Sequence, residues 1–243
     1  MERTALITGA SQGLGLALAR RLAAEGWALA IDARRPDRLA AAADELRVLT
    51  RVAAIAGDIT DPDHRLRLVT AARLLGPVRL VVNNASTLGA SPLPALDTVD
   101  ADVLRRTFDV NVVAPIALVQ LLAPALEPGA TIVNITSDAA VEAYPTWGGY
   151  GASKAALEHA GRVLAVEHPE WRVLTVDPGD MRTEMHQAAF PGEDIADRPA
   201  PEASVPGLMA LIGDEHPSGR YTTEQIAFET STARHVAAEQ VAP

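Results

Sequence analysis

Tyr150 and Lys154 are the first pair of side chains in this sequence whose types and spacing could do acid–base chemistry. On a helix, residues four apart lie on one face, one turn from each other. An ammonium group beside a phenol favours loss of the phenol proton, whose usual pKa is about 10. The pair could therefore exchange a proton with a bound carbonyl or alcohol. Two residues at this spacing are common by chance, so a surface helix with a solvated lysine is the alternative unless other segments agree.

The elements that must position this pair form a repeating pattern of strand and helix. Apolar runs predict strands at 4–7, 28–31, 52–55, 79–82, 131–135 and 171–176, and a last strand beginning near Gly219. Helical spacing predicts helices from Leu16 to a cap at Gly26, and at 36–49, 62–75, 99–126, 150–167 and 201–213. This alternation predicts an α/β fold, a Rossmann-type, doubly wound parallel sheet with helices on both faces, in a single domain over residues 1–243.

In such a sheet, ligands bind beyond the carboxyl ends of the strands. Gly9, Asp58, Asn84, Ser137 and Gly179 all follow predicted strands directly, so we expect them to converge on one crevice. The first strand runs into a glycine-rich turn, residues 8–15, and then a helix. Glycines let the backbone approach a pyrophosphate, and a helix N-terminus offers free N–H groups. The turn therefore predicts a nucleotide site.

Composition and charge narrow the function classes. The chain has 243 residues, 48% hydrophobic and 21% charged, as in an ordinary globular protein. Its net charge of -10 argues against a nucleic-acid partner or an acidic membrane surface. With no cysteine it has no disulfide and no thiolate metal site, and its scattered histidines predict no metal site. We expect no signal peptide and no apolar stretch that reaches the length of a membrane span, hence a cytoplasmic protein.

Two segments depart from the strand–helix pattern. Residues 180–206 are rich in proline and mixed charge, and because they follow a strand end we expect a lid over the substrate, with a plain connector as the alternative. His186 lies in this segment and is a candidate substrate contact. Residues from about 222 to 243 show little apolar periodicity and are expected to form a loose or partner-packed tail.

Several motifs together resemble the short-chain dehydrogenases/reductases over roughly residues 4 to 183. They are the turn Thr8-Gly9-Ala10-Ser11-Gln12-Gly13-Leu14-Gly15, then Asn83-Asn84-Ala85, Asn111, Ser137, Tyr150-x-x-x-Lys154 and Pro178-Gly179. Ser86 stands where the family usually has glycine. The resemblance implies an enzyme that interconverts a ketone or aldehyde and an alcohol, commonly as a homo-oligomer, a dimer or tetramer, packed through the helices that contain Asn111 and Tyr150.

The family pattern also implies a role for each matched residue. Tyr150 would protonate the carbonyl oxygen, and Lys154 would lower the pKa of Tyr150 and hold the nicotinamide ribose. Ser137 would hydrogen-bond the substrate oxygen, and Asn111 would hold a water that links Lys154 to solvent. Asp58 and Ile59 would contact the adenine, and Thr183 the nicotinamide carboxamide. The remaining cofactor contacts implied are Gly9, Ser11, Gln12, Gly13, Leu14, Gly15, Asn84, Ala85, Ser86, Pro178, Gly179 and Met181.

The cofactor depends on which residue reads the ribose. A general dinucleotide fingerprint selects Asp32, which would bind both ribose hydroxyls and predict NAD(H). By the family pattern the deciding position is Ala33, followed by Arg34 and Arg35, which could bind a 2′-phosphate. We therefore favour NADP(H), with NAD(H) bound by Asp32 as the alternative. A dinucleotide sensor without turnover is the alternative from another class of function.

Overall fold

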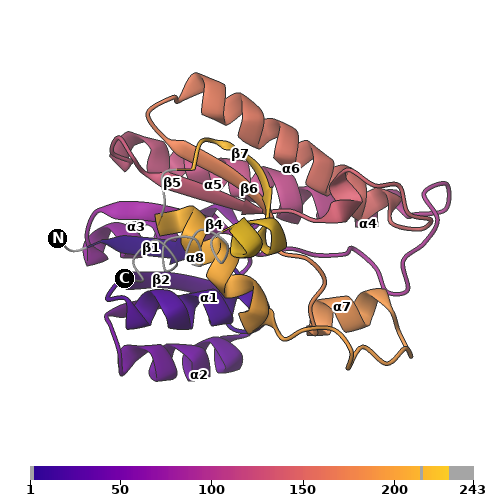
Figure 1. The fold of residues 1–243 in the computed structure, drawn as a ribbon, viewed down its shortest axis with the longest axis horizontal. Helices are drawn as coiled ribbons and strands as arrows, with labels where there is room; N and C mark the ends of the chain where they lie inside the picture. The colour runs from indigo at the N-terminus through magenta and orange to yellow at the C-terminus, as the bar shows by residue number, and fades with distance from the viewer. Residues whose placement is uncertain (1–2, 214–215, 230–243) are drawn as a thin grey trace, which may run out of the picture.

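The strands form one parallel sheet whose order places the predicted site at its centre. The computed structural model describes residues 3–213 and 216–229. The strand order is β3-β2-β1-β4-β5-β6-β7 (Figure 1). The strands are β1 (Thr4–Ile7), β2 (Ala28–Ala33), β3 (Val52–Ala56), β4 (Val78–Asn83), β5 (Thr131–Ile135), β6 (Arg172–Asp177) and β7 (Gly219–Thr222). The predicted single-domain α/β fold with a doubly wound sheet is confirmed.

Helices cover both faces of this sheet because successive strand residues point to opposite sides. Leu6 packs into one core cluster, with α3 and α5, and its neighbour Ile7 packs into the other, with α1, α2 and α8. Figure 1 shows α1 and α2 on one side of the sheet and α5 and α6 on the other. The helices are α1 (Gly13–Ala24), α2 (Pro36–Arg47), α3 (Pro62–Leu75), α4 (Ala101–Phe108), α5 (Ala114–Leu122), α6 (Gly148–Glu167), α7 (Glu184–Ala189) and α8 (Val205–Gly213).

The predicted long helix at 99–126 consists of several helical segments. A π-helical turn, Asp109–Val113, joins α4 to α5, and the N–H of Ala114 donates to the carbonyl of Asp109, five residues back. The run Ala101–Ala125 is long and apolar enough to cross a membrane, so our expectation that no stretch reaches that length was wrong. Core helices of globular proteins pass the same test. Leu118 and Leu122 are completely buried against the sheet, which fits a core helix.

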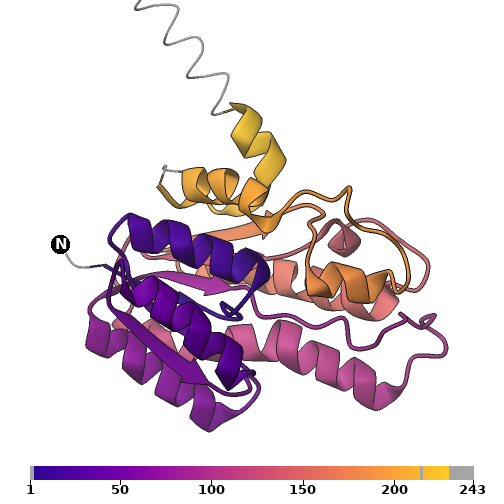
Figure 2. The ribbon, with the colours of Figure 1, turned by 90° about the horizontal axis from the view of Figure 1, so that it is seen from below.

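The segment after β6 crosses the carboxyl edge of the sheet and returns along its side. It contains the short helix α7, then a 3-10 turn and α8, which packs beside α1 (Figure 2). Residues 223–229, the start of the predicted loose tail, are helical, and Ile226 is 2% exposed in the core cluster. The prediction of a loose tail was wrong for these residues. The remainder, 230–243, lies outside the described residues.

Candidate active site

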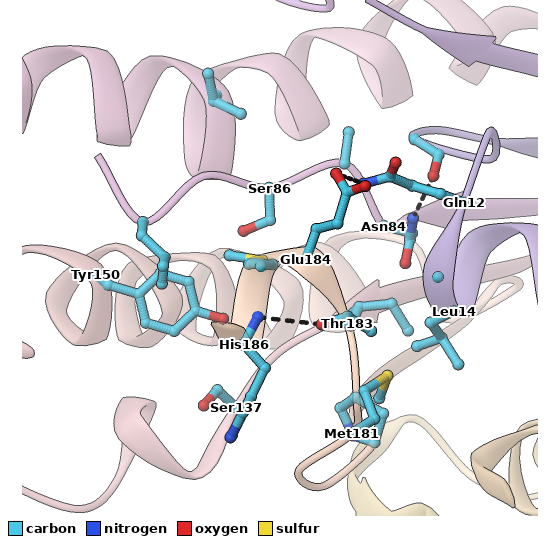
Figure 3. Close-up of a pocket in the computed structure, with 18 of the residues that line it drawn as sticks. Gln12, Leu14, Asn84, Ser86, Ser137, Tyr150, Met181, Thr183, Glu184 and His186 are labelled. Atoms are coloured by element: carbon cyan, nitrogen blue, oxygen red, sulfur yellow. Dashed lines mark hydrogen bonds between the residues drawn. The ribbon is translucent and has the colours of Figure 1, made fainter. Parts of the chain in front are cut away.

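One cavity of about 380 Å³ lies at the carboxyl edge of the sheet and collects most of the predicted site. It is lined by residues that follow β1, β2, β3, β4, β5 and β6, as the topology requires. Every predicted catalytic or cofactor residue lines it except Gly15 and Asn111, which lie behind its wall. Figure 3 shows Tyr150, Ser137 and His186 at one end of this cavity and Gln12, Asn84 and Leu14 at the other.

The glycine-rich turn requires glycine at positions where the backbone passes close to Asn84. Gly9 has φ +68°, in the left-handed region that favours glycine. A Cβ at Gly15 would lie 2.6 Å from both Asn84 Nδ2 and the Gly9 carbonyl oxygen. Asn84 Nδ2 itself donates to the carbonyls of Thr8 and Gly9, at 2.8 and 3.2 Å. The turn is thus held open at the N-terminus of α1, where a pyrophosphate would bind.

Asp32 lies inside β2 and lines the cavity, but both of its carboxylate oxygens already have protein partners. Its Oδ1 accepts from the Gly9 N–H at 2.8 Å, and its Oδ2 lies 2.9 Å from His64 Nε2. Asp32 is 2% exposed and His64 is completely buried. A Cβ at Gly57 would lie 2.2 Å from His64 Nδ1, so glycine there leaves room for the ring. Asp32 therefore supports the glycine-rich turn. The contact between Asp32 and His64 was not predicted from the sequence.

The arginines after β2 form the basic part of the cavity. Arg34 and Arg35 are exposed on its lining, as expected, and Arg38 in the first turn of α2 joins them. Arg38 Nη1 lies 2.7 Å from Glu184 Oε1 and also donates to Gln12. Gln12 Nε2 donates to Glu184 Oε2 at 3.3 Å (Figure 3). Glu184 begins α7, so this cluster joins the glycine-rich turn and α2 to the predicted lid.

Tyr150 is buried at the opposite end of the cavity. Desolvation by burial raises the pKa of Tyr150 above its usual value, and the charge of Asp177 adds to this, while the hydroxyls of Ser137 and Ser86 act in the opposite direction. Ser137 Oγ donates to Asp138 Oδ1 at 2.8 Å. At neutral pH the phenol therefore keeps its proton, which makes it an acid rather than a base.

Lys154 lies close to Tyr150, and its ammonium is held by the backbone. Its Nζ donates to the Ile135 carbonyl at 2.8 Å and lies 5.6 Å from the centroid of the Tyr150 ring. Burial lowers the pKa of Lys154 to about 8. The expectation that the lysine lowers the pKa of Tyr150 stays a prediction, and in this structure desolvation of the phenol has the largest effect on that pKa.

Asn111 is completely buried in the π-helical turn, and both ends of its side-chain amide form hydrogen bonds. Its Nδ2 donates to the Thr87 carbonyl and to Ser153 Oγ, both at 2.9 Å, and its Oδ1 accepts from Ser86 Oγ and the Thr87 N–H. The side chain therefore fixes the loop after β4 against α6, one residue from Lys154. The predicted water link to Lys154 stays a prediction.

Comparison with known proteins agrees with this geometry. The family model of the short chain dehydrogenases matches residues 3–194. The chain belongs to this family. It is 35% identical to a sulfoacetaldehyde reductase of Chromohalobacter salexigens, over 97% of this chain and 91% of that protein.

Solved structures of short-chain dehydrogenases have the same fold as this chain. A Burkholderia cenocepacia member in complex with NADP superposes with a TM-score of 0.81 at 30% identity, covering 90% of this chain and 94% of that one. An alcohol dehydrogenase of Thermococcus sibiricus, complexed with 5-hydroxy-NADP, gives 0.82 at 25% identity, covering 91% and 96%. The chain is thus an oxidoreductase that acts on CH–OH or C=O groups.

An ion pair between α4 and the loop after β3 of this dehydrogenase was not predicted. Arg106 of α4 binds Asp58, which also accepts from the N–H and hydroxyl of Thr60, at 2.9 and 2.8 Å. Burial alone would raise the pKa of Asp58, but these donors together lower it. The carboxylate expected to contact adenine is therefore already held by protein groups. Arg106 lies 48 positions from Asp58, and no spacing pattern links the two.

The second unpredicted network lies behind the catalytic end of the dehydrogenase cavity. Arg220 of β7 bridges Glu158 of α6 and Asp177 at the end of β6, at 3.0 and 3.1 Å, and donates to the Ser137 carbonyl. Both carboxylates are buried. Arg220 thus fixes the backbone at Ser137 from the edge strand. Within residues 3–213 and 216–229, no group of three or more His, Asp or Glu side chains could hold a metal ion.

Proposed function

We propose that this dehydrogenase reduces a ketone or aldehyde to an alcohol with NADPH, and catalyses the reverse oxidation with NADP⁺. The observation that carries the proposal is the convergence of Tyr150, Ser137 and Lys154 in the cavity that also contains the glycine-rich turn. When bound, the nicotinamide supplies or takes the hydride. The protein's part is to position the substrate and to manage the proton and the charge on oxygen.

Residues of the cavity fit a dinucleotide phosphate. The glycine-rich turn lines the cavity at the N-terminus of α1, and Gly15 behind it lets Gly9 and Asn84 approach closely. Arg34, Arg35 and Arg38 supply positive charge at the end of β2, where a 2′-phosphate would bind. Asp32, the residue of the NAD(H) alternative, is occupied by Gly9 and His64. These contacts favour NADP(H) over NAD(H).

Each catalytic side chain has a task that follows from its surroundings. The Tyr150 hydroxyl, protonated because burial raises its pKa, would give its proton to the substrate oxygen as negative charge develops there. Ser137 would donate a second hydrogen bond to that oxygen and so release Asp138. Lys154 would hold the nicotinamide ribose, and Asn111 would keep the loop after β4 in place. Thr183 and Met181 line the same cavity and would contact the nicotinamide.

The substrate is a small molecule, and we propose that it enters beneath the segment 180–206, acting as a lid. A relative is named for sulfoacetaldehyde, an anionic aldehyde, which is therefore one of the compounds to test. We further propose that the protein acts in the cytoplasm, with neither nucleic acid nor membrane as a partner. A homo-oligomer would pack through α4, α5 and α6, where Val113 and Val163 are exposed apolar side chains.

The variant Tyr150→Phe tests the reaction. It removes the transferable proton and leaves the ring in place, so we expect turnover to fall by at least about a hundredfold while NADPH still binds. Nicotinamide fluorescence measures binding, and the loss of NADPH absorbance measures turnover. Full activity in the variant would refute the role of Tyr150, and failure of the wild type to bind either NADPH or NADH would refute the enzyme proposal as a whole.

A further inference from the structure

The end of the cavity around Tyr150 is lined by apolar and acidic side chains. Trp147 meets Tyr150 edge-on, with ring centroids 5.7 Å apart, and Met185 and Ala189 of α7 add apolar surface. Asp138 and Asp180 also line the cavity. Asp138 binds the Ser137 hydroxyl, and Asp180 lies 3.8 Å from the His186 ring, which Figure 3 shows beside Tyr150. A substrate at Tyr150 therefore meets Asp138 and Asp180, while a third carboxylate in the lining, Asp177, is paired with Arg220.

The carboxylate of Asp138 is held in place by three donors. Its Oδ1 accepts from Ser137 Oγ and from the Ala139 N–H, both at 2.8 Å, and its Oδ2 accepts from the Tyr144 hydroxyl at 2.9 Å. The hydrogen bond to Asp138 raises the pKa of Tyr144, and the charge of Asp180 adds to the shift. The two carboxylates thus act on the same rim of the cavity. When Ser137 turns to a substrate, the Ala139 N–H and the Tyr144 hydroxyl still hold this carboxylate in place.

Positive charge lies elsewhere in the cavity. Arg34 follows β2, and Ser137 follows β5, three strands away, which corresponds to about 14 Å at the usual strand spacing. Lys154 Nζ is bound to the Ile135 carbonyl beneath the phenol. In the part of the chain that the structure describes, no other arginine or lysine lines the end around Tyr150.

The lid segment adds further negative charge near the Tyr150 end of the cavity. Residues 180–206 carry six acidic residues against two arginines. Arg198 pairs with Asp197 at 2.7 Å and with Asp180 at 3.5 Å, and Arg182 donates to the Ala196 carbonyl at 3.3 Å. Both arginines are therefore engaged within the segment, and its remaining charge is negative. An anion that approaches the cavity under this lid meets like charge before it meets a partner.

We infer that the substrate is a carbonyl compound with an apolar body and no anionic group. The inference rests on the proposed reduction and names its substrate class. A carboxylate or sulfonate bound at Tyr150 would lose its hydration, find no cation other than Lys154, which is bound to the Ile135 carbonyl, and face Asp138. His186 Nε2 is buried without a partner, so it offers one hydrogen bond to a neutral polar group. On this ground the chain differs in substrate from its relative named for sulfoacetaldehyde.

Two aldehydes of nearly equal shape test the inference. The probes are 4-formylbenzamide, which is neutral, and 4-formylbenzoate, which is anionic, each reduced with NADPH. We expect kcat/KM to be at least about tenfold higher for the amide, as repulsion by a nearby fixed charge requires. The variant Asp138→Asn should raise the benzoate-to-benzamide ratio several-fold. Any difference in intrinsic reactivity between the aldehydes is the same in both proteins and cancels in that comparison.

The matched control is Glu193→Gln, which removes a lid carboxylate that does not line this cavity and should leave the ratio unchanged. Equal or better reduction of the benzoate, or of sulfoacetaldehyde, by the wild type would overturn the inference. If NADPH binds and no aldehyde is reduced, the proposed reaction fails instead. Binding of the two probes to the NADPH complex, measured by tryptophan fluorescence, then decides the inference about charge. Tighter binding of the benzamide supports the inference, and tighter binding of the benzoate overturns it.

Discussion

The nucleotide end and the substrate end of the cavity are built alike, from loops at the carboxyl ends of parallel strands, but they carry opposite charge. After β2 the chain places Arg34, Arg35 and Arg38 on the cavity lining, whereas after β5 and β6 it places Asp138 and Asp180. Because the sheet fixes both ends, a ligand with phosphates at one end and a neutral ring at the other has one favourable orientation. For the proposed dinucleotide phosphate, the contrast would direct the nicotinamide, which carries no negative charge, towards Tyr150.

The largest expected effect comes from removing the positive end. The double variant Arg34→Gln, Arg38→Gln should weaken NADPH binding by about a hundredfold, since each charge-assisted hydrogen bond is worth about 1.5–3 kcal/mol. NADH, which has no 2′-phosphate, should bind as before. Fluorescence titration of both cofactors measures this. Arg47→Gln, which removes an arginine at the far end of α2, is the control. Equal loss for both cofactors would mean that the arginines do not read the phosphate.

Asp32→Asn separates support of the turn from recognition of the ribose. The change leaves His64 buried beside a neutral amide and weakens the contact to Gly9, so unfolding should become easier by about 3 kcal/mol. That corresponds to a fall in Tm of about 6–12 °C for a chain of this size. The ratio of NADPH to NADH affinity should stay constant. A selective loss of NADH binding would instead assign Asp32 to the ribose. The exposed neighbour Asp37→Asn is the control.

Lys154 gives a pH dependence with a defined sign. Its pKa is lowered to about 8, so the ammonium is present below that pH and is lost above it. NADPH affinity should therefore fall by up to about tenfold between pH 7 and pH 9, where about a tenth of the ammonium remains. Lys154→Met should bind weakly at both values. Titrations across this range measure the effect, and an unchanged affinity in the wild type would separate Lys154 from the cofactor.

The smallest effect concerns the carboxylate that reaches across from the lid. Glu184 would compete with the proposed 2′-phosphate for Arg38, and the contact with Arg38 lowers the pKa of Glu184. The pair is exposed, so its loss is worth about 0.2–1 kcal/mol. Glu184→Gln should therefore tighten NADPH binding by about 1.4- to fivefold, with less change for NADH. Glu202→Gln, whose partner Arg20 lies outside the cavity, should change neither.

Local patterns were sufficient to predict the sheet and most of the cavity lining. The strand ends placed Gly9, Asn84 and Ser137 together because parallel strands end at one edge. The second strand ends at Ala33, two residues later than predicted, which keeps Asp32 within the sheet. Because β2 ends at Ala33, Arg34 is the first residue after the strand and lies on the cavity lining.

Contacts between residues far apart in the sequence could not be predicted. The pairs of Arg38 with Glu184 and of Arg220 with Glu158 join residues 146 and 62 positions apart, and arginine and glutamate are common at every exposed surface. The π-helical turn at Asn111 has no pattern of its own, since its residues suit an α-helix equally well. The raised pKa of Tyr150 depends on burial, which spacing alone does not give.

Lys154, buried beneath Tyr150, is the only lysine in the sequence, and every other basic residue that is not histidine is arginine. Reagents that acylate primary amines therefore have one side-chain target in this protein, and it lies in the active site. Because its pKa is about 8, a large share of this amine is uncharged and nucleophilic in mildly alkaline buffer. The mass added at this position would report how fully the cavity is occupied, and surface coupling through lysine would attach the enzyme by its own catalytic centre.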